Sequence, residues 1–271
     1  MPEGDTIHRH ARNHRDLFVG RNVAASSPQG RFSAGASHIN GKRLEAVEAV
    51  GKHLFYTFEK RLMLHVHLGL VGSFRTHRTI ERPAPSRGTR LVLSAGDAAA
   101  YLTGPMKCEL LDRIEVHRLK EWLGPDPLDP EADVGEFASN LATRTGPIGA
   151  VLLDQDVIAG IGNVWRAELL FLCHIDPDTP ANELTSGQVD CLWTHAVTGL
   201  QHGVEVGQIE TVTPQAIGLP KGTQLRPSDK RYVYKRGGHG CLLCGAEIAV
   251  SRHGGRALFY CPQCQDPLKA Q

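Results

Sequence analysis

The chain has 271 residues, of which 41% are hydrophobic and 22% are charged, a composition typical of ordinary globular proteins. No apolar run approaches the roughly twenty residues of a membrane span, and the acidic start lacks the basic and apolar segments of a secretory signal. We therefore expect a cytoplasmic protein with two domains, a small appendage and no membrane segment.

The net charge of +1 conceals an uneven distribution. Basic side chains outnumber acidic ones by 18 to 11 in residues 1–118 and by 9 to 3 in residues 221–271, whereas residues 119–220 carry 3 basic and 15 acidic side chains. Two basic ends are suited to binding one polyanion, although solvated surface charge is the alternative explanation.

The chain opens with Met1-Pro2-Glu3-Gly4-Asp5-Thr6. Trimming of the initiator methionine would expose the amine of Pro2, which could attack a sugar aldehyde and form an iminium ion, an electron sink. Most prolines at this position have no such role, so these six residues alone leave catalysis open.

A helix is predicted from Asp5 or Thr6, either of which can cap it, to about Phe18, with Gly20 as its end. Residues spaced four, three and four apart form one face, namely Ile7, Ala11, His14 and Phe18. The positive end of the helix dipole would then lie close to Pro2.

Residues 40–115 are predicted to form strands, which are separated by short turns and by a loop rich in proline and arginine at 78–89. The expected strands are Leu44–Val50, Leu54–Phe58, Met63–Leu68, Leu91–Ser94 and Ala98–Leu102. Their number and spacing predict a β-sandwich or a barrel.

Two motifs in this region contain candidate functional residues. Gly51-Lys52-His53-Leu54 places a lysine at the head of a strand, where a lone lysine usually faces solvent. In the segment 65–73, His65 and His67 share one strand face; we favour hydrogen-bonding histidines over metal ligands, because no carboxylate follows at a fixed spacing. Leu70, between two glycines, is either an exposed apolar tip or a core residue.

Gly124-Pro125-Asp126-Pro127 indicates a domain boundary, after which the pattern becomes helical. The expected helices are Glu131–Thr143, Ile148–Asp154, Val164–His174 and Thr185–Val206, followed by a polar linker at 207–230. Within this part, the segment 154–164 brings two glycines and Asn163 to the start of a helix, where amides and the helix dipole favour a phosphate. A tight turn between helices is the alternative.

The spacing Cys241-x2-Cys244-x16-Cys261-x2-Cys264 is typical of a tetrahedral zinc site, although a rubredoxin-like iron site has similar ligands. Four cysteines leave no open position, so the metal is predicted to be structural. Between the two pairs, residues 251–256 form a predicted turn that would present Arg256, unless that arginine is simply solvated.

The other cysteines are Cys108, Cys173 and Cys191. Because the cysteine count is odd and no secretion signal is present, we expect no disulfide framework and interpret these three as small core residues.

In combination, these motifs resemble the Fpg/Nei family of DNA glycosylases/AP lyases, which excise oxidised bases. The resemblance spans nearly the whole chain and rests on Pro2–Gly4, Gly51–Leu54, His67–Gly72, Asp154–Asn163 and Gly255–Gln265. The opening Pro2–Thr6 and the segment Tyr232–Arg236 are most similar to the endonuclease VIII branch of actinobacterial type.

The resemblance implies an α+β multidomain fold. It consists of an N-terminal β-sandwich with a leading helix over residues 2–118, a helix–two-turn–helix domain over 125–220 and a C-terminal four-cysteine zinc finger over 231–265.

It also implies a role for each matching residue. Pro2 would attack C1′ of the damaged nucleotide, and Glu3 would act as general acid and proton shuttle. Lys52 would contact the phosphate beside the lesion and assist proton transfer. Arg256 would hold the lesion phosphate and promote δ-elimination.

The implied partner is damaged double-stranded DNA, bound by a monomer with one structural zinc and no nucleotide cofactor. Leu70 would fill the space left by the flipped nucleotide, while Gly162 and Asn163 would bind phosphate. Phosphate contacts make such binding salt-dependent.

Some positions depart from the family pattern. Thr6 replaces a glutamate found in many relatives, Gly149 replaces a phosphate-binding lysine of Fpg enzymes and Trp122 replaces an arginine. The segment 207–230 does not match the Fpg loop that caps oxidised guanine. These departures favour oxidised pyrimidines as substrates.

Three alternatives remain at this stage. The chain could be a catalytically silent DNA- or lesion-binding protein on the same scaffold. It could be an Fpg-type enzyme that prefers 8-oxoguanine. It could be a metalloenzyme built on His65 and His67.

Overall fold

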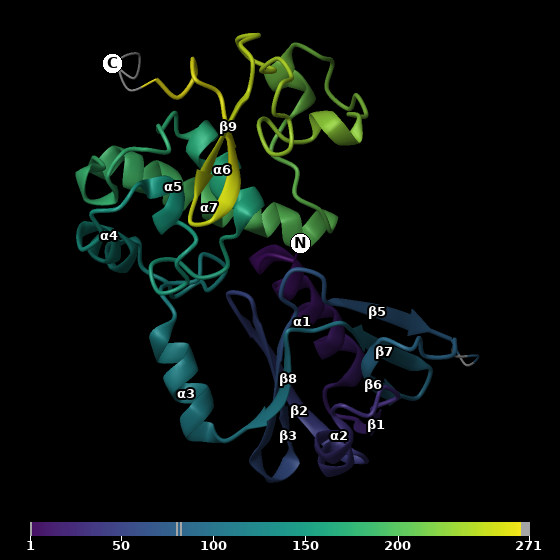
Figure 1. The fold of residues 1–271 in the computed structure, drawn as a ribbon. Helices are drawn as coiled ribbons and strands as arrows, with labels where there is room; N and C mark the ends of the chain where they lie inside the picture. The colour runs from purple at the N-terminus through teal and green to yellow at the C-terminus, as the bar shows by residue number, and fades with distance from the viewer. Residues whose placement is uncertain (1, 80, 82, 267–271) are drawn as a thin grey trace. The chain divides into compact units, whose positions relative to one another are not determined.

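The computed structural model describes residues 2–79, 81 and 83–266, so Met1 lies outside the described residues. The chain divides into two compact units, Met1–Trp122 and Leu123–Gln271, each with its own apolar core. Figure 1 shows strands in the first unit and mainly helices in the second, which gives the predicted α+β fold. Among the described residues, no helix combines the length and apolar character needed to cross a membrane.

The first unit contains eight antiparallel strands in the spatial order β5-β7-β6-β1-β2-β3-β4-β8. They are β1 (Asn22–Ser26), β2 (Lys42–Val50), β3 (His53–Phe58), β4 (Leu62–His67), β5 (Ser73–Arg78), β6 (Thr89–Ala95), β7 (Ala98–Thr103) and β8 (Lys107–Leu111). Strand β1 joins two halves of the sheet, β5-β7-β6 and β2-β3-β4-β8. Its first two residues pair with β2, and its last three pair with β6. Buried side chains of both halves share one core, as expected for a β-sandwich.

All five predicted strands are present, but β1, β5 and β8 were not anticipated. Strand β5 lies at the edge of the sheet and carries mostly exposed polar side chains, so it offers little apolar pattern. Its position depends on pairing with β7 from Ser73↔Thr103 to Arg78↔Ala98. Such edge strands are determined by tertiary pairing more than by their own sequence.

Three α-helices accompany this sheet: α1 (Gly4–Phe18), α2 (Ser33–Ile39) and α3 (Arg113–Trp122). The predicted apolar face of α1 is buried at Ile7, Ala11, His14 and Phe18. A short 3-10 turn, η1 (Glu59–Arg61), connects β3 to β4. The sequence did not predict α2 or α3, both of which are short or largely polar.

The second unit contains α4 (Val134–Ala142), α5 (Ile148–Val151), α6 (Asn163–Leu172) and α7 (Ser186–Val206), then the hairpin β9 (Ala249–His253) and β10 (Arg256–Tyr260). Short 3-10 turns lie between these elements at η2 (Ala181–Glu183), η3 (Pro214–Ile217) and η4 (Pro227–Asp229). Helix α4 begins three residues later than predicted, because Asp133 caps it by accepting a hydrogen bond from Gly135 N at 2.9 Å.

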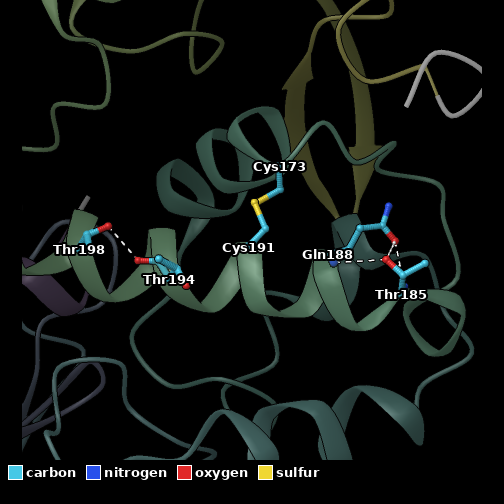
Figure 2. Close-up of a disulfide and its surroundings, with 6 residues drawn as sticks. All are labelled: Cys173, Thr185, Gln188, Cys191, Thr194 and Thr198. Carbon is cyan, nitrogen blue, oxygen red and sulfur yellow. Dashed lines mark hydrogen bonds between the residues drawn. A yellow bond between two sulfur atoms is a disulfide. The ribbon is translucent and has the colours of Figure 1, made fainter. Parts of the chain in front are cut away.

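The expectation that Cys173 and Cys191 are separate core residues was wrong, because they form a disulfide (Figure 2). Their Cα atoms are 5.8 Å apart, since the C-terminal end of α6 packs against α7. The prediction relied on compartment and cysteine count, and neither reports which helices touch. Cys108 is a free thiol, and burial raises its pKa to about 12.

His14 is a fully buried polar side chain in the sandwich core. Its Nδ1 lies 2.7 Å from the hydroxyl of Tyr56, and its ring meets the edge of Phe74 at 4.7 Å between centroids. Burial, reinforced by His10, lowers the pKa of His14 from 6.5 to about 3. His14 is therefore neutral at physiological pH.

This burial predicts a pH dependence of stability. Because the folded pKa lies below the unfolded one, the contribution of His14 is complete above about pH 6.5 and is lost as the pH falls toward 3. Within that window the loss is about 1.4 kcal/mol per pH unit. We expect the free energy of unfolding, measured in urea at several pH values, to depend less steeply on pH in His14→Gln than in the wild type. The difference in slope should correspond to roughly one proton fewer taken up on unfolding. The exposed His117→Gln should keep the wild-type slope.

Candidate functional site

Pro2 lies directly before α1 and lines a pocket of about 360 Å³ in the first unit. The other walls come from α1, from the segment that joins β4 to β5 and from β5 itself, and include Thr6, Arg9, His10, Asn13, Leu68, Gly72, Ser73, Phe74 and Thr76. Pro2 is a partly exposed residue. Thr6, which departs from the family pattern, faces the same pocket.

Charge near this pocket is set by the start of α1. Glu3 is fully buried and occupies the N-cap, where its carbonyl accepts a hydrogen bond from Ile7 N at 3.1 Å. The positive end of the helix dipole therefore lies beside Pro2, as predicted. Burial, reinforced by the Arg9 guanidinium, lowers the pKa of His10 to about 4, so that a neutral imidazole lines the pocket.

Lys52 lies in the two-residue turn between β2 and β3, which are paired up to Val50↔His53. Gly51 has φ of 55°, a left-handed conformation that favours glycine at this turn. Next to the turn, His53 pairs with His67 at the end of β4, which the loop 68–72 follows. The Lys52 turn and this loop, whose Leu68 and Gly72 line the Pro2 pocket, thus lie at the same end of the sandwich.

The histidines near Lys52 are hydrogen-bonded, which confirms the prediction made for them. His53 Nδ1 lies 2.9 Å from His65 Nε2, and His65 Nδ1 lies 3.1 Å from a carboxylate oxygen of Glu109. His67 Nδ1 accepts a hydrogen bond from Gly69 N at 3.0 Å. The sequence did not reveal Glu109 as a partner because β8, which brings it opposite His65, was not predicted.

Leu70 is 62% exposed, which decides between the two interpretations in favour of an apolar tip. Val71 and Met106 are exposed next to it in the fold, at 83% and 64%. The loop requires its glycines: Gly69 has φ of 67°, and a Cβ on Gly72 would lie 2.2 Å from the carbonyl oxygen of Leu68.

In the second unit, Gly162 is the N-cap of α6 and Asn163 is its first residue. The side-chain nitrogen Nδ2 of Asn163 donates to Ala257 O at 3.0 Å, and the side-chain oxygen Oδ1 accepts from Arg166 at 2.6 Å. The side chain therefore fixes the hairpin β9–β10 to the start of α6. The turn before α6 is held by Gln155, whose Oε1 accepts from Gly160 N at 3.2 Å.

Arg256 follows the hairpin turn Gly254-Gly255, where both residues have positive φ, 57° and 73°. A two-residue turn in which both residues have positive φ matches the twist of the two strands that it connects. Arg256 is exposed and lines a pocket of about 590 Å³ within the second unit, together with Arg144. The predicted turn is therefore present, with an exposed Arg256 directly after it.

Arg166 is a fully buried residue that sequence reasoning missed. Its guanidinium donates to the carbonyls of Gly149, His253 and Ala257, the last two at 3.1 and 3.3 Å. It therefore links α5, α6 and the hairpin. A lone arginine in a helical pattern carries no sign of burial, so only the fold could reveal it.

Gly149 has a packing reason for lacking a side chain. A Cβ at this position would lie 3.0 Å from Pro177 O and 3.3 Å from the ring of His253. A side chain at this position would therefore require Pro177 and His253 to shift slightly. Trp122, the other departure in this region of the sequence, is 55% exposed at the end of α3.

The four clustered cysteines have sulfur atoms within 4.8 Å of one another. The Sγ atoms of Cys241 and Cys264 are 3.9 Å apart, and those of Cys244 and Cys261 are 3.5 Å apart. Zinc–sulfur distances of about 2.3 Å imply tetrahedron edges of about 3.8 Å, so these spacings fit. The four side chains therefore form a ligand set for a metal ion.

Glu168 is a fully buried carboxylate on α6 that was also missed. It accepts hydrogen bonds from the backbone nitrogens of Tyr232, Val233 and Tyr234 at 2.8, 3.0 and 2.8 Å, and from the hydroxyl of Thr211. Glu168 thereby holds two segments against α6, namely Thr211 within the predicted linker 207–230 and the backbone directly after that linker. Charge-assisted bonds of this kind are stronger than neutral ones.

Comparison with known proteins agrees with this architecture. The profile of the formamidopyrimidine-DNA glycosylase N-terminal domain matches residues 1–105, and that of the formamidopyrimidine-DNA glycosylase H2TH domain matches residues 123–215. "Endonuclease 8 1" of Mycobacterium tuberculosis is 41% identical over 98% of this chain and 100% of its own length. "Probable endonuclease 8 2" of Streptomyces coelicolor is 32% identical, covering 98% and 94%.

Solved structures show the same fold. A complex of Lactococcus lactis Fpg with DNA containing an abasic site superposes with a TM-score of 0.80 at 24% identity, covering 97% of this chain and 99% of that one. A mutant of the same protein with Fapy-dG containing DNA has a TM-score of 0.79 at 25% identity, covering 98% and 100%.

The contacts of Glu168 predict a large loss of stability in Glu168→Ala. Removing the carboxylate leaves three buried backbone N–H groups without their acceptor, at about 1–3 kcal/mol each. We expect the free energy of unfolding in urea to fall by about 3 kcal/mol or more. Glu183→Ala, at an exposed position, should stay within about 0.5 kcal/mol of wild type; equal losses in both variants would contradict the assignment.

Proposed function

This chain belongs to the formamidopyrimidine-DNA glycosylase family of base excision repair enzymes, and we propose that it excises oxidised bases from DNA through a Schiff base on Pro2. The observation that carries the proposal is the position of Pro2, partly exposed in a polar pocket beside the N-terminal end of α1. The proposal requires that Met1 be removed.

Two nearby features favour a neutral, nucleophilic amine. An α-amine has a pKa of about 7.7–8.0, against about 10.4 for a lysine, although the secondary amine of proline is intrinsically more basic. We propose that the positive end of α1 favours the neutral form of the Pro2 amine. The Lys52 cation, on the turn at the same end of the sandwich, is proposed to act in the same direction.

In the proposed reaction, the nitrogen of Pro2 attacks C1′ and the bond from C1′ to the base breaks. Glu3 protonates the ring oxygen of the deoxyribose, which opens the sugar and yields an iminium ion. Loss of a proton from C2′, with Glu3 as proton shuttle, then expels the 3′ phosphate by β-elimination. Removal of a second proton expels the 5′ phosphate by δ-elimination, a step that we assign to Arg256.

The remaining residues are proposed to bind the damaged duplex. Lys52 contacts the phosphate beside the lesion, while Gly162 and Asn163 bind phosphate at the start of α6. Leu70 replaces the flipped nucleotide in the stack, an assignment supported by its exposure. The DNA complexes of the Lactococcus lactis relatives support damaged DNA as the partner.

The four cysteines are proposed to hold one structural zinc ion, because four thiolates at tetrahedral spacing leave no open position for substrate. We also propose the domain boundaries 2–118, 125–220 and 231–265 for sandwich, helical domain and finger. The bacterial relatives support a cytoplasmic location, and we expect a monomer.

Oxidised pyrimidines are the proposed substrates. Thr6, which lines the Pro2 pocket, stands where many relatives carry a glutamate, and Gly149, which is closely packed, stands where Fpg enzymes carry a lysine. Relatives named endonuclease 8 are 41% and 32% identical to this chain, which favours that branch. An Fpg-type preference for 8-oxoguanine is the alternative, since a Thermus thermophilus Fpg is also 31% identical.

A trapping assay tests the nucleophile. Protein beginning at Pro2 is expected to form a covalent adduct with abasic-site DNA that borohydride reduction makes permanent, because the iminium ion is its precursor. One additional residue ahead of Pro2 should abolish the adduct while DNA binding persists. Pro2→Gly should trap more slowly, whereas Pro28→Gly, at an exposed turn, should match wild type.

Adduct formation by the protein with an additional residue ahead of Pro2 would contradict the proposal. If neither the wild-type protein nor any variant forms an adduct, the result favours the alternative that the chain is a catalytically silent DNA-binding protein.

Elemental analysis tests the metal. Purified protein should contain one zinc per chain, which Cys241→Ser loses because three thiolates hold zinc more weakly than four. Cys108→Ser, outside the cluster, should retain it. One iron per chain would contradict zinc, and additional metal lost in His65→Ala would support the histidine metalloenzyme.

A panel of duplexes tests the substrate. Excision of thymine glycol and 5-hydroxyuracil should exceed that of 8-oxoguanine opposite cytosine by about tenfold or more, measured as single-turnover rates. The reverse order would assign the chain to the Fpg branch.

A further inference from the structure

The disulfide of the second unit lies beside a third group that can take part in thiol chemistry. Cys173 is the C-cap of α6, Cys191 lies on α7, and His195 follows one turn later on α7. Both sulfur atoms and a ring nitrogen of His195 lie within 4.8 Å of one another. Figure 2 shows the bond connecting the two helices.

Cys191 and His195 are partly exposed, so a small reagent can reach Cys191. Their surroundings differ from those of Cys108, whose thiol has its pKa raised to about 12 by burial. Partial burial lowers the pKa of His195, which keeps the imidazole neutral and able to accept a proton. In a reducing cytoplasm, disulfides are usually transient.

We propose that Cys173 and Cys191 form a reversible thiol–disulfide site, oxidised by low-molecular-weight disulfides, with His195 as the base that takes the proton of the attacking thiol. Cys173 and Cys191 are not among the four cysteines assigned to zinc, and the site is distinct from every residue assigned to the glycosylase reaction.

The oxidation balances as two thiol–disulfide exchanges. His195 takes the proton of Cys191, whose thiolate attacks one sulfur of the small disulfide; the S–S bond of that reagent breaks, and one thiolate leaves. The thiolate of Cys173 then attacks the sulfur of Cys191 and expels the second small thiolate. The two cysteines lose two electrons and two protons, and the reagent becomes two thiols.

The bond also acts on the segment that supports the cysteine cluster. The residue after Cys173, His174, donates from Nδ1 to Cys264 O at 2.9 Å. The next residue, Ile175, accepts from the Gln265 amide at 2.9 Å, and Gln265 Oε1 accepts from Cys261 N at 2.8 Å. Fixing Cys173 to α7 therefore restrains the two residues that hold the second cysteine pair.

Two thiolates and one imidazole could instead bind a soft metal ion, with one position open. A metal ion and a disulfide are mutually exclusive, because the disulfide removes both thiolates. The observed bond favours the redox role.

The test uses full-length, zinc-loaded protein reduced with a phosphine and then exposed to oxidised glutathione. Remaining thiols are alkylated after denaturation and mapped by mass spectrometry. We expect a cross-linked peptide pair containing Cys173 and Cys191, while Cys108 stays alkylated. The oxidised protein should unfold roughly 5–10 °C higher than the reduced protein, and its amides at 261–265 should exchange hydrogen more slowly.

Single substitutions distinguish the roles of the two cysteines and of His195. Cys191→Ser should leave Cys173 unable to cross-link, and Cys173→Ser should trap a mixed disulfide of glutathione on Cys191. His195→Gln should form the same bond several-fold more slowly near neutral pH, with the difference shrinking at alkaline pH, where no base is needed. Cys108→Ser should behave as wild type. None of these measurements depends on glycosylase activity.

Full alkylation of both cysteines after glutathione treatment would overturn the proposal. So would uptake of a second zinc by the reduced protein that His195→Ala abolishes and that blocks oxidation, since this would identify a metal site.

Discussion

The structure of the second unit depends on the buried charges of α6. Arg166, near the start of the helix, holds the carbonyls of α5 and the β9–β10 hairpin, and Glu168 holds the backbone after the linker. Burying a charge is costly unless hydrogen bonds replace its water, so each group fixes the segments that supply its partners. The β9–β10 hairpin, including Arg256, takes its position from this helix, and His174, just after the helix, contacts the cysteine cluster.

In the first unit the equivalent constraint is the burial of α1. The helix has its apolar face in the sandwich core, which fixes where the chain begins relative to the sheet. Pro2 thus borders the loop after β4, and the Lys52 turn lies at the same end of the sandwich. Glu3, immediately after Pro2, is buried and occupies the N-cap of α1, which restrains the backbone next to Pro2.

One departure from the family pattern is related to this packing. A Cβ on Gly149 would lie close to Pro177 and to the ring of His253, in the hairpin that Arg166 holds, so a side chain here would require these neighbours to shift. Thr6, in contrast, borders the Pro2 pocket, so a change at this position alters the lining of that pocket.

The sequence by itself determined the features that depend on local pattern: the apolar face of α1, the central strands, the hairpin turn before Arg256 and the cysteine spacing. These are readable because side-chain period, glycine conformation and ligand spacing are short-range properties. Only the tertiary structure decided the edge strands, the Cys173–Cys191 bond and the burial of Arg166 and Glu168. Each of these depends on a partner far away in the chain, and a polar residue carries no local mark of the partner that will bury it.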